Sequence, residues 1–235
     1  MKIVCSNCGS ENDDLVYKCL QCGNILQDKI ANLNFFETFW SILESPFETF
    51  NKILRAEHKN YTLFLYYTFT TSIVYFSIWI NKFGSNFDNL IYLILFSQII
   101  STVIFIPFTF LYSHIIFLLL KVFNCKVSLK NCYAIGGWSS VPFAIYFFIL
   151  IPIGLGIEGL SFFTTFTSAL TNTKIIFFGL TSILSFYFLI LFNIGLIKIM
   201  REFSLINFVK SIFATLITII SITYLCNEVI KKIMS

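Results

Sequence analysis

The stretch from Asn89 to Leu120 contains thirty-two residues and no Asp, Glu, Lys or Arg. A helix on the surface of a soluble protein carries charged residues on its outer face, and this stretch offers none. A single helix of this length would reach about 48 Å, well beyond the ~30 Å hydrocarbon core of a bilayer. We therefore expect the stretch to lie in a membrane, either as one long helix or as two short ones.

The composition of the whole chain extends this expectation beyond one segment. Hydrophobic residues make up 57% of the 235 residues and charged residues 12%, about half the charged share of an average soluble domain. Thirty Phe and eleven Tyr lie mostly in long runs without the polar interruptions of a soluble fold. The predicted fold class is an all-α polytopic membrane bundle.

Five membrane-spanning helices are predicted if the long stretch crosses the membrane once. The uncharged intervals give spans at about residues 61–81, 89–122, 142–161, 175–198 and 210–228. The last interval is short, so Lys210 is expected to extend its side chain toward the membrane surface.

The distribution of Lys and Arg separates one crossing from two. With one crossing, nine of these residues lie on the side of the N-terminus and four on the other, whereas two crossings divide them six to seven. The nine are Lys52, Arg55, Lys59, Lys121, Lys126, Lys130, Lys198, Arg201 and Lys210, and the four are Lys82, Lys174, Lys231 and Lys232. The positive-inside rule expects Lys and Arg to be concentrated on one side of the membrane, so it favours the arrangement with one crossing. It predicts one long helix, kinked near Pro107, with the N-terminus in the cytoplasm and the C-terminus outside.

The N-terminal region carries the most specific motif of the chain, two Cys-x-x-Cys-Gly pairs. Its cysteines are Cys5, Cys8, Cys19 and Cys22. Two intervening residues let both thiolates of a pair reach one ion, and the Gly after each pair permits a tight turn. Four thiolates complete a tetrahedral shell, so the pattern predicts a structural Zn²⁺ site in a small ribbon. Disulfides or a redox motif would require an oxidising compartment or a βαβ scaffold, and zinc is the favoured interpretation.

The charge of the ribbon argues against nucleic acid as a partner. Residues 1–27 hold two Lys against three carboxylates, a balance of −1. Four thiolates and one divalent ion add about −2 more. Because an acidic unit does not attract phosphate, we expect no nucleic acid binding. Contact with a cytoplasmic protein partner, or simple structural capping, is the expected role.

Two short amphipathic helices are predicted between the ribbon and the first span. Asn34 with Glu37, and Ser45 with Glu48, have the spacing of capping boxes, and Pro46 is placed at the first position of the second helix. One face of the first helix is expected to hold Phe35, Phe36, Phe39, Trp40 and Leu43. Helices of this kind lie in the headgroup layer or dock on the bundle, and both interpretations stay open.

The segment between the second and third spans has an intermediate character. Residues 128–141 read SLKNCYAIGGWSSV, too polar to span a membrane and too apolar to face water. The pair Gly136-Gly137 is expected to break any helix, and Pro142 to begin the next one. This predicts a re-entrant segment or one that lies along the membrane surface.

With these strings in view, the chain resembles the Yip family, the Ypt/Rab-interacting membrane proteins and their prokaryotic relatives. The resemblance covers about residues 35–230. It rests on WSILESPFETFNKI at residues 40–53, on five spans with an extended second one, and on Tyr133 followed by GGWSSVP at residues 136–142. A zinc ribbon ahead of this domain is familiar in bacterial and archaeal members.

The resemblance implies an integral membrane protein, which in eukaryotes acts in vesicle traffic through small GTPases and membrane shaping. This chain lacks the DLYGP-type string that eukaryotic members carry before their first span, so GTPase binding is not carried over, and neither is any catalytic residue. The predicted location is the cell membrane of a prokaryote. The lipid bilayer is the one partner that the resemblance and the composition both imply.

The predicted membrane interior offers few reactive groups. The candidate polar residues are Gln98, His114 and Asn193; every Asp lies outside the predicted spans, and the sequence has no His-Glu-x-x-His. We therefore expect a non-enzymatic protein that organises the membrane or recruits a partner. A small permease or channel with helices broken at positions such as Pro152 is the first alternative. An intramembrane enzyme using His114 or Glu158 is the second.

The sequence divides into three predicted regions. Residues 1–27 form the zinc ribbon, residues 28–59 the linker and interfacial helices, and residues 60–230 the Yip-like transmembrane domain. The partner, any transported solute and the oligomeric state are left open.

Overall fold

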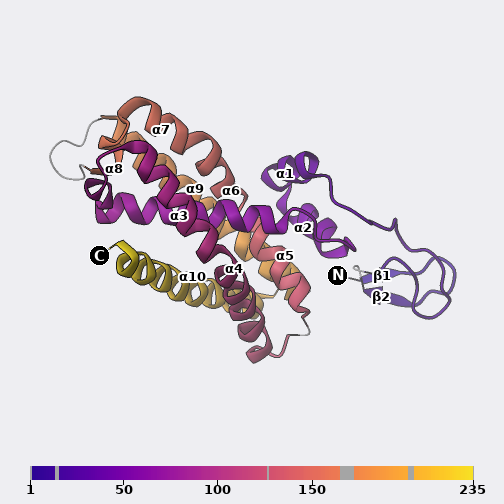
Figure 1. The fold of residues 1–235 in the computed structure, drawn as a ribbon. Coiled ribbons are helices and arrows are strands. Elements are labelled where there is room, and N and C mark those ends of the chain that lie inside the picture. Colours follow the sequence, from indigo (N-terminus) through magenta and orange to yellow (C-terminus); the bar gives the residue numbers. More distant parts are fainter. Residues whose placement is uncertain (1, 14–15, 126, 165–171, 201–203, 235) are drawn as a thin grey trace.

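A computed structural model describes residues 2–13, 16–125, 127–164, 172–200 and 204–234. Figure 1 shows a small N-terminal sheet that lies beside a long helical bundle. The elements are the strands β1 (Lys2–Val4) and β2 (Glu11–Asp13), the helices α1 (Phe35–Glu44), α2 (Pro46–Arg55), α3 (Thr62–Asn81), α4 (Leu90–Val122), α5 (Leu129–Ser139), α6 (Val141–Ile145), α7 (Ile151–Glu158), α8 (Ser161–Thr164), α9 (Asn172–Met200) and α10 (Leu205–Met234), the 3₁₀ turn η1 (Phe83–Asn86) and the π-helical turn η2 (Tyr146–Leu150). The predicted fold class, a helical membrane bundle with a small N-terminal β unit, is confirmed.

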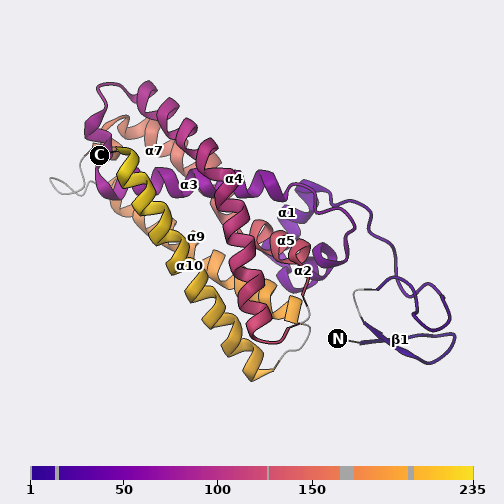
Figure 2. The same cartoon turned by 60° about the horizontal axis from the view of Figure 1, so that its bottom comes forward.

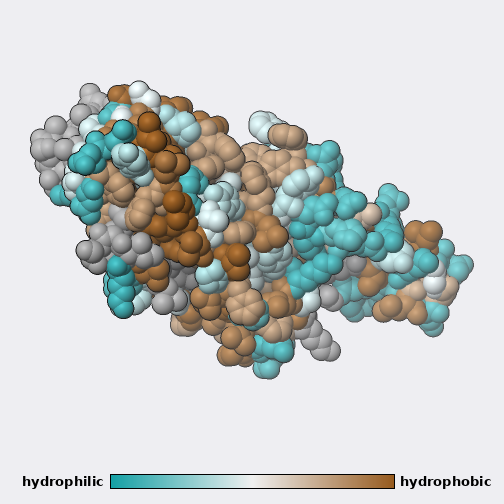
Figure 3. Space-filling view, viewed as in Figure 1, coloured by the Kyte–Doolittle hydropathy of each residue, from teal (hydrophilic) through white to brown (hydrophobic). Residues whose placement is uncertain are grey.

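The described residues contain four helical segments long and apolar enough to cross a membrane. They are α3, α4, the continuous run of α6, η2 and α7, and α9; within its described side chains, α10 contributes a shorter apolar segment, Leu205–Ser221. Figure 3 shows hydrophobic side chains over the middle of the bundle and hydrophilic ones toward both ends. This distribution is the one that a membrane protein requires, because apolar side chains contact lipid along the middle of the bundle.

The long uncharged stretch forms one helix, as the Lys and Arg distribution predicts. Helix α4 runs for 33 residues through Pro107 without interruption, and Asn89 caps its start by accepting from the Ile91 N–H at 2.9 Å. Figure 2 shows the helix changing direction part way along. Pro107 supplies the physical reason, since its ring removes one backbone hydrogen bond and displaces the preceding turn.

Helix α3 lies at the centre of the bundle. Its apolar stretch is 67% buried, against 33% for α4 and 28% for α9. Small Thr and Ser residues on α3 let the neighbouring helices approach closely. Their hydroxyls donate to backbone carbonyls of α3 itself: Thr70 to Tyr66, Thr71 to Tyr67 and Ser72 to Thr68, at 2.7–2.8 Å. These buried hydroxyls are therefore satisfied by the backbone of α3 itself, and Ser72 also lies 3.0 Å from the Phe143 carbonyl of α6.

Helix α5 corrects one part of the prediction for residues 128–141. Gly136 and Gly137 do not break a helix; they lie inside α5, and the segment from Ala134 to Ser139 is fully buried in the protein. Pro142 stands in the first turn of α6, as predicted. A Cβ on Gly136 would come within 2.1 Å of the Tyr66 hydroxyl, and one on Gly137 within 2.4 Å of Thr62. The glycines thus serve helix packing, since their missing side chains let α5 lie directly against α3.

The third span is continuous but not uniform. Five residues of π-helix, Tyr146–Leu150, separate α6 from α7, and Pro152 follows directly in the first turn of α7. Proline lacks the N–H that the carbonyl of Phe148 would otherwise receive, and a π turn is a common way to accommodate such a loss. Pro152 therefore shifts the register of this span without breaking it.

The two pre-membrane helices form as predicted, with one difference in capping. Asn34 accepts from the Glu37 N–H at 3.4 Å, and Pro46 occupies the first turn of α2. The second predicted capping box is wrong, because the Ser45 hydroxyl donates to the Ser41 carbonyl of α1 at 3.4 Å. Ser45 is both the C-terminal cap of α1 and the N-terminal cap of α2. Because its hydroxyl bonds to α1, it does not cap α2.

A buried ion pair joins the end of α7 to the start of α9. Glu158 Oε2 lies 3.4 Å from Lys174 Nζ, and the two side chains are 10% and 6% exposed. Lys174 also donates to the Ser161 carbonyl at 3.3 Å, which ties α8 to the same point. Because each charge would be costly to bury alone, loss of either partner would destabilise this end of the bundle.

The glycine packing gives a first prediction. We expect Gly136→Ala to lower the thermal stability of the full chain in detergent, at a cost of about 1–3 kcal/mol, because the added methyl overlaps Tyr66 and Tyr112. Gly179→Ala in α9 is the matched control, since a Cβ there meets nothing within 4 Å. The control should be neutral or stabilising by up to ~1 kcal/mol. Equal unfolding temperatures for Gly136→Ala and wild type would contradict the close contact between α5 and α3.

Candidate metal centre and polar groups of the membrane interior

The N-terminal unit consists of a two-stranded sheet and two cysteine turns. Strand β1 pairs antiparallel with β2, with Lys2 opposite Asp13, and an isolated bridge joins Lys18 to Ile25 beside the second turn. Cys5 and Cys19 are among its few buried side chains, at 1% and 3% exposed. A unit of this size has almost no hydrophobic core, so its fold needs another source of stability, such as a bound ion.

The two cysteine turns share one backbone design. In each turn the first cysteine's N–H bonds to a carbonyl five residues later, and the glycine's N–H bonds back to that cysteine's carbonyl. The bonds are Cys5 to Ser10 at 2.9 Å, Gly9 to Cys5 at 2.9 Å, Cys19 to Asn24 at 2.8 Å and Gly23 to Cys19 at 3.0 Å. Gly9 and Gly23 have φ of +71° and +73°, a conformation that favours glycine. The predicted reason for these two glycines is therefore correct.

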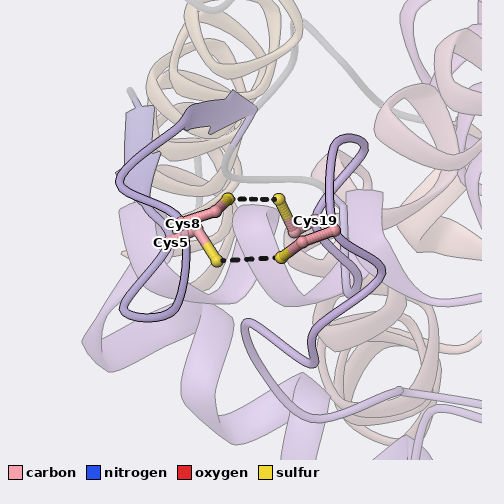
Figure 4. A group of neighbouring side chains, drawn as sticks. Cys5, Cys8 and Cys19 are labelled. Carbon is pink, nitrogen blue, oxygen red and sulfur yellow. Dashed lines mark hydrogen bonds between the residues drawn. The ribbon is translucent and has the colours of Figure 1, made fainter.

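The four thiols converge on one point, as Figure 4 shows. All four Sγ atoms lie within 4.8 Å of one another, and the Cys5–Cys22 and Cys8–Cys19 sulfurs are each 3.6 Å apart. A disulfide needs a sulfur separation of ~2.05 Å, so these are free thiols. A tetrahedral ion with metal–sulfur bonds of ~2.3 Å places its sulfurs about 3.8 Å apart, and the cluster fits such an ion.

Two polar residues between the cysteine pairs support the cluster, and sequence analysis missed both. The Ser10 hydroxyl lies 3.1 Å from the sulfurs of both Cys8 and Cys19, and the buried Asn12 amide lies 3.5 Å from Cys19. The Ser10 hydroxyl, followed by the backbone N–H of Cys22, lowers the pKa of Cys19 to about 5. Donors of this kind hold a sulfur in the thiolate form that a metal requires.

Three large apolar side chains of the unit are exposed. Val4 is 63% exposed, Leu20 83% and Ile25 67%. Figure 3 shows hydrophobic areas beside hydrophilic ones on this unit.

Gln98, the first candidate polar residue of the interior, joins two spans. The Tyr67 hydroxyl donates to Gln98 Oε1 at 2.9 Å, and Gln98 Nε2 donates to the Tyr75 hydroxyl at 3.4 Å. Both tyrosines belong to α3, and Gln98 to α4. The amide is thus occupied by helix packing, a use that small polar side chains commonly have in membranes.

His114 and Asn193 likewise bond to neighbouring atoms of the bundle. His114 Nδ1 lies 2.8 Å from the Phe110 carbonyl one turn before it. Asn193 donates to the Leu189 carbonyl at 2.8 Å and accepts from the Ser211 hydroxyl at 3.1 Å, which links α9 to α10. Gln98 and His114 lie 16 residues apart on α4, about 24 Å along the helix, so the three residues do not form one site.

The two residues considered for an intramembrane enzyme lie at opposite ends of the bundle. Glu158 pairs with Lys174 beside α8, and α8 packs against η1 at the end where α4 begins. His114 lies 24 residues along α4 from Leu90, a distance of about 36 Å. His114 and Glu158 therefore share no reaction site.

Comparison with known proteins gives one match. The model of the Yip1 domain family matches residues 40–226, from the middle of α1 into α10. The N-terminal cysteine unit lies outside the matched region. No curated protein and no solved structure matches the chain.

The cysteine cluster gives a second prediction. Purified wild-type protein should contain about one zinc ion per chain, and the double variant Cys5→Ser/Cys19→Ser should contain almost none. Metal content should fall as the pH is lowered, because protons compete with the ion for the thiolates. Elemental analysis checks both statements.

Cys125→Ser is the matched control, because Cys125 lies outside the cluster and its loss should leave the metal content unchanged. The assignment fails if the double variant retains the wild-type content, or if wild type carries no metal.

Proposed function

Because the chain belongs to the Yip1 family of membrane proteins, we propose that it is a non-enzymatic protein that organises one face of the bilayer and recruits a protein partner there. The observation that carries the proposal is the docking of α1 and α2 on the membrane domain. These helices hold exposed aromatic side chains and the cysteine unit at the same end of the bundle.

Helix α1 presents one aromatic face to the bundle and another outward. The expected single aromatic face divides in two: Phe35, Phe39 and Leu43 pack against the core, whereas Phe36 is 82% exposed and Trp40 63% exposed. The Trp40 indole N–H donates to Glu44 at 2.6 Å, so the polar edge of the ring is satisfied. Aromatic side chains with this placement suit the headgroup layer, and they support the proposal that α1 inserts there.

Helix α2 fixes the position of α1. Phe50 and Ile53 are fully buried, and α2 packs against α5 and α9. Lys52 of α2 pairs with Glu37 of α1, and Tyr187 of α9 donates to the Leu43 carbonyl at 2.9 Å. The outward aromatic residues are therefore held at a set depth relative to the spans, as a membrane-organising role requires.

The linker keeps the cysteine unit near the same end of the bundle. The N–H groups of Glu57 and His58 donate to the carbonyls of Ile30 and Ala31 at 2.9 and 3.0 Å, and the Leu33 side chain is buried. Only seven residues separate Cys22 from Ile30. A partner bound to the unit would thus be held close to the membrane surface, which supports recruitment.

The ion that we propose for the cluster is Zn²⁺ in a structural role. Four thiolates leave no open position for a substrate, so the site stabilises the unit and performs no reaction. The unit then presents Leu20 and Ile25 as a fixed apolar surface for the partner.

We propose that this end of the molecule lies in the cytoplasm, at the plasma membrane of a prokaryote. Because α4 is a single helix, it is expected to cross the membrane once. With one crossing, most Lys and Arg residues lie on the side of the N-terminus, which the positive-inside rule assigns to the cytoplasm. Free cysteines are also typical of a reducing compartment.

A third prediction concerns the depth of Trp40. In vesicles that contain brominated phosphatidylcholine, part of the wild-type tryptophan emission should be quenched, because Trp40 contacts lipid whereas Trp79 and Trp138 are buried. Trp40→Phe should remove most of the quenching, and the matched variant Trp79→Phe should preserve it. Unchanged quenching in Trp40→Phe would show that α1 does not enter the bilayer.

A fourth prediction concerns partner recruitment. Affinity purification from native membranes should recover a protein with wild type and lose it with both Leu20→Gln and Cys5→Ser/Cys19→Ser. Leu20→Gln should keep its metal, because Leu20 is 83% exposed and contributes no ligand. Leu20→Met preserves an apolar side chain and should therefore retain the partner. Recovery of the same proteins with Leu20→Gln and wild type would count against this surface.

A further inference from the structure

A cavity of about 560 Å³ lies between α3, α9 and α10, inside the membrane-spanning segments. Helix α4 and the segment of α6 and η2 complete its wall. Sites that bind small molecules commonly have volumes of about 300–1,000 Å³, so this cavity has room for an occupant. The surroundings of these spans are lipid, which restricts what that occupant is.

One end of the cavity is closed by aromatic rings. The ring centroid of Phe69 lies 4.7 Å from that of Phe143, 5.2 Å from that of Phe188 and 5.9 Å from that of Tyr112. All four residues line the cavity. They form a floor near the middle of α3, so the cavity does not continue through the bundle as a pore would.

The other end opens to the outside of the bundle near the C-terminal end of α3. Ile80, Ile220 and Tyr224 line the cavity there and are 46%, 64% and 67% exposed. Helix α3 ends one residue after Ile80, so this mouth lies toward one surface of the membrane. The described residues that line the mouth are aliphatic or aromatic, and none of them is charged.

The length of the cavity matches one leaflet of a bilayer. Eleven residues separate Phe69 in the floor from Ile80 at the mouth, which corresponds to about 16 Å along the helix. The hydrocarbon core of a bilayer is ~30 Å thick, so one leaflet contributes about 15 Å. A lipid chain that stands upright in its leaflet therefore has the length to fill the cavity.

Two hydroxyls of the wall are satisfied by backbone carbonyls. The Ser72 hydroxyl lies 2.7 and 3.0 Å from the carbonyl oxygens of Thr68 and Phe143, and Thr181 donates to the Phe177 carbonyl at 2.8 Å. The Tyr112 hydroxyl is buried without a hydrogen-bond partner among the described residues. Most of the remaining lining is aliphatic or aromatic, so the wall favours hydrocarbon.

We propose that this cavity binds one acyl chain of a bilayer phospholipid, drawn from the leaflet at the C-terminal end of α3. The chain enters at Ile80 and Ile220, runs between α3, α9 and α10, and ends against the aromatic floor. The bound lipid contributes to the attachment of α10, which borders the cavity through Ile219, Ile220 and Tyr224.

The test uses the full chain in vesicles of dioleoylphosphatidylcholine. These vesicles also contain a phosphatidylcholine with a diazirine near the end of one acyl chain. After irradiation, peptide mass spectrometry should find label on Phe69, Phe143 or Phe188. Ser185→Phe fills the cavity from α9 and should reduce this labelling at least about tenfold, the loss expected when ~1.4 kcal/mol of binding free energy is removed.

Ser182→Phe is the matched control, because it makes the same change on the exposed side of α9 and should leave the labelling unchanged. Ser77→Leu fills the cavity from α3 and gives the same test if Ser185→Phe does not fold. The proposal is overturned by label confined to residues outside the cavity, by undiminished floor labelling in both filling variants, or by an equal loss in Ser182→Phe.

Discussion

The close contact between α5 and α3 is the interaction on which the rest of the structure depends. Gly136 and Gly137 leave no room for a side chain against Tyr66, Tyr112 and Thr62, so two helix backbones meet directly. Helix α5 then packs against α2, α4 and α9 as well. A short segment that does not span the membrane thereby joins the spans to the pre-membrane helices.

This contact connects the membrane domain to the proposed function. Helix α2 rests on α5 and α9, α1 is fixed to α2, and the linker of the cysteine unit bonds to the end of α2. Each step places the next element at the same end of the bundle. In the proposed role, the spans supply a fixed base, α1 enters the headgroup layer, and the zinc-bound unit presents its apolar surface to a partner. In this role the protein would catalyse no reaction and would hold α1 and a bound partner at the membrane surface.

The sequence predicted those features that depend on one local cause. The uncharged stretch and the Lys and Arg distribution predicted α4 as one helix, and the two Cys-x-x-Cys-Gly pairs predicted the convergence of four thiols. Features decided by tertiary packing were not predictable. Gly136-Gly137 has low helix propensity, and burial against α3 outweighs it. The division of the α1 aromatic residues, and the support of the cysteines by Ser10 and Asn12, also depend on neighbours that a one-dimensional pattern does not reveal.

Hydrogen–deuterium exchange of the full chain in lipid nanodiscs tests most directly whether α2 is docked and so holds the N-terminal elements in place. The account predicts that the amides of Phe50 to Arg55 exchange slowly, at rates close to those of α5, because the two helices share one buried core. Rapid exchange of α2, at the rate of the exposed residues around Lys29, would contradict it. The pre-membrane helices would then be a loose tether, and the aromatic residues and the cysteine unit would have no fixed place at the membrane surface.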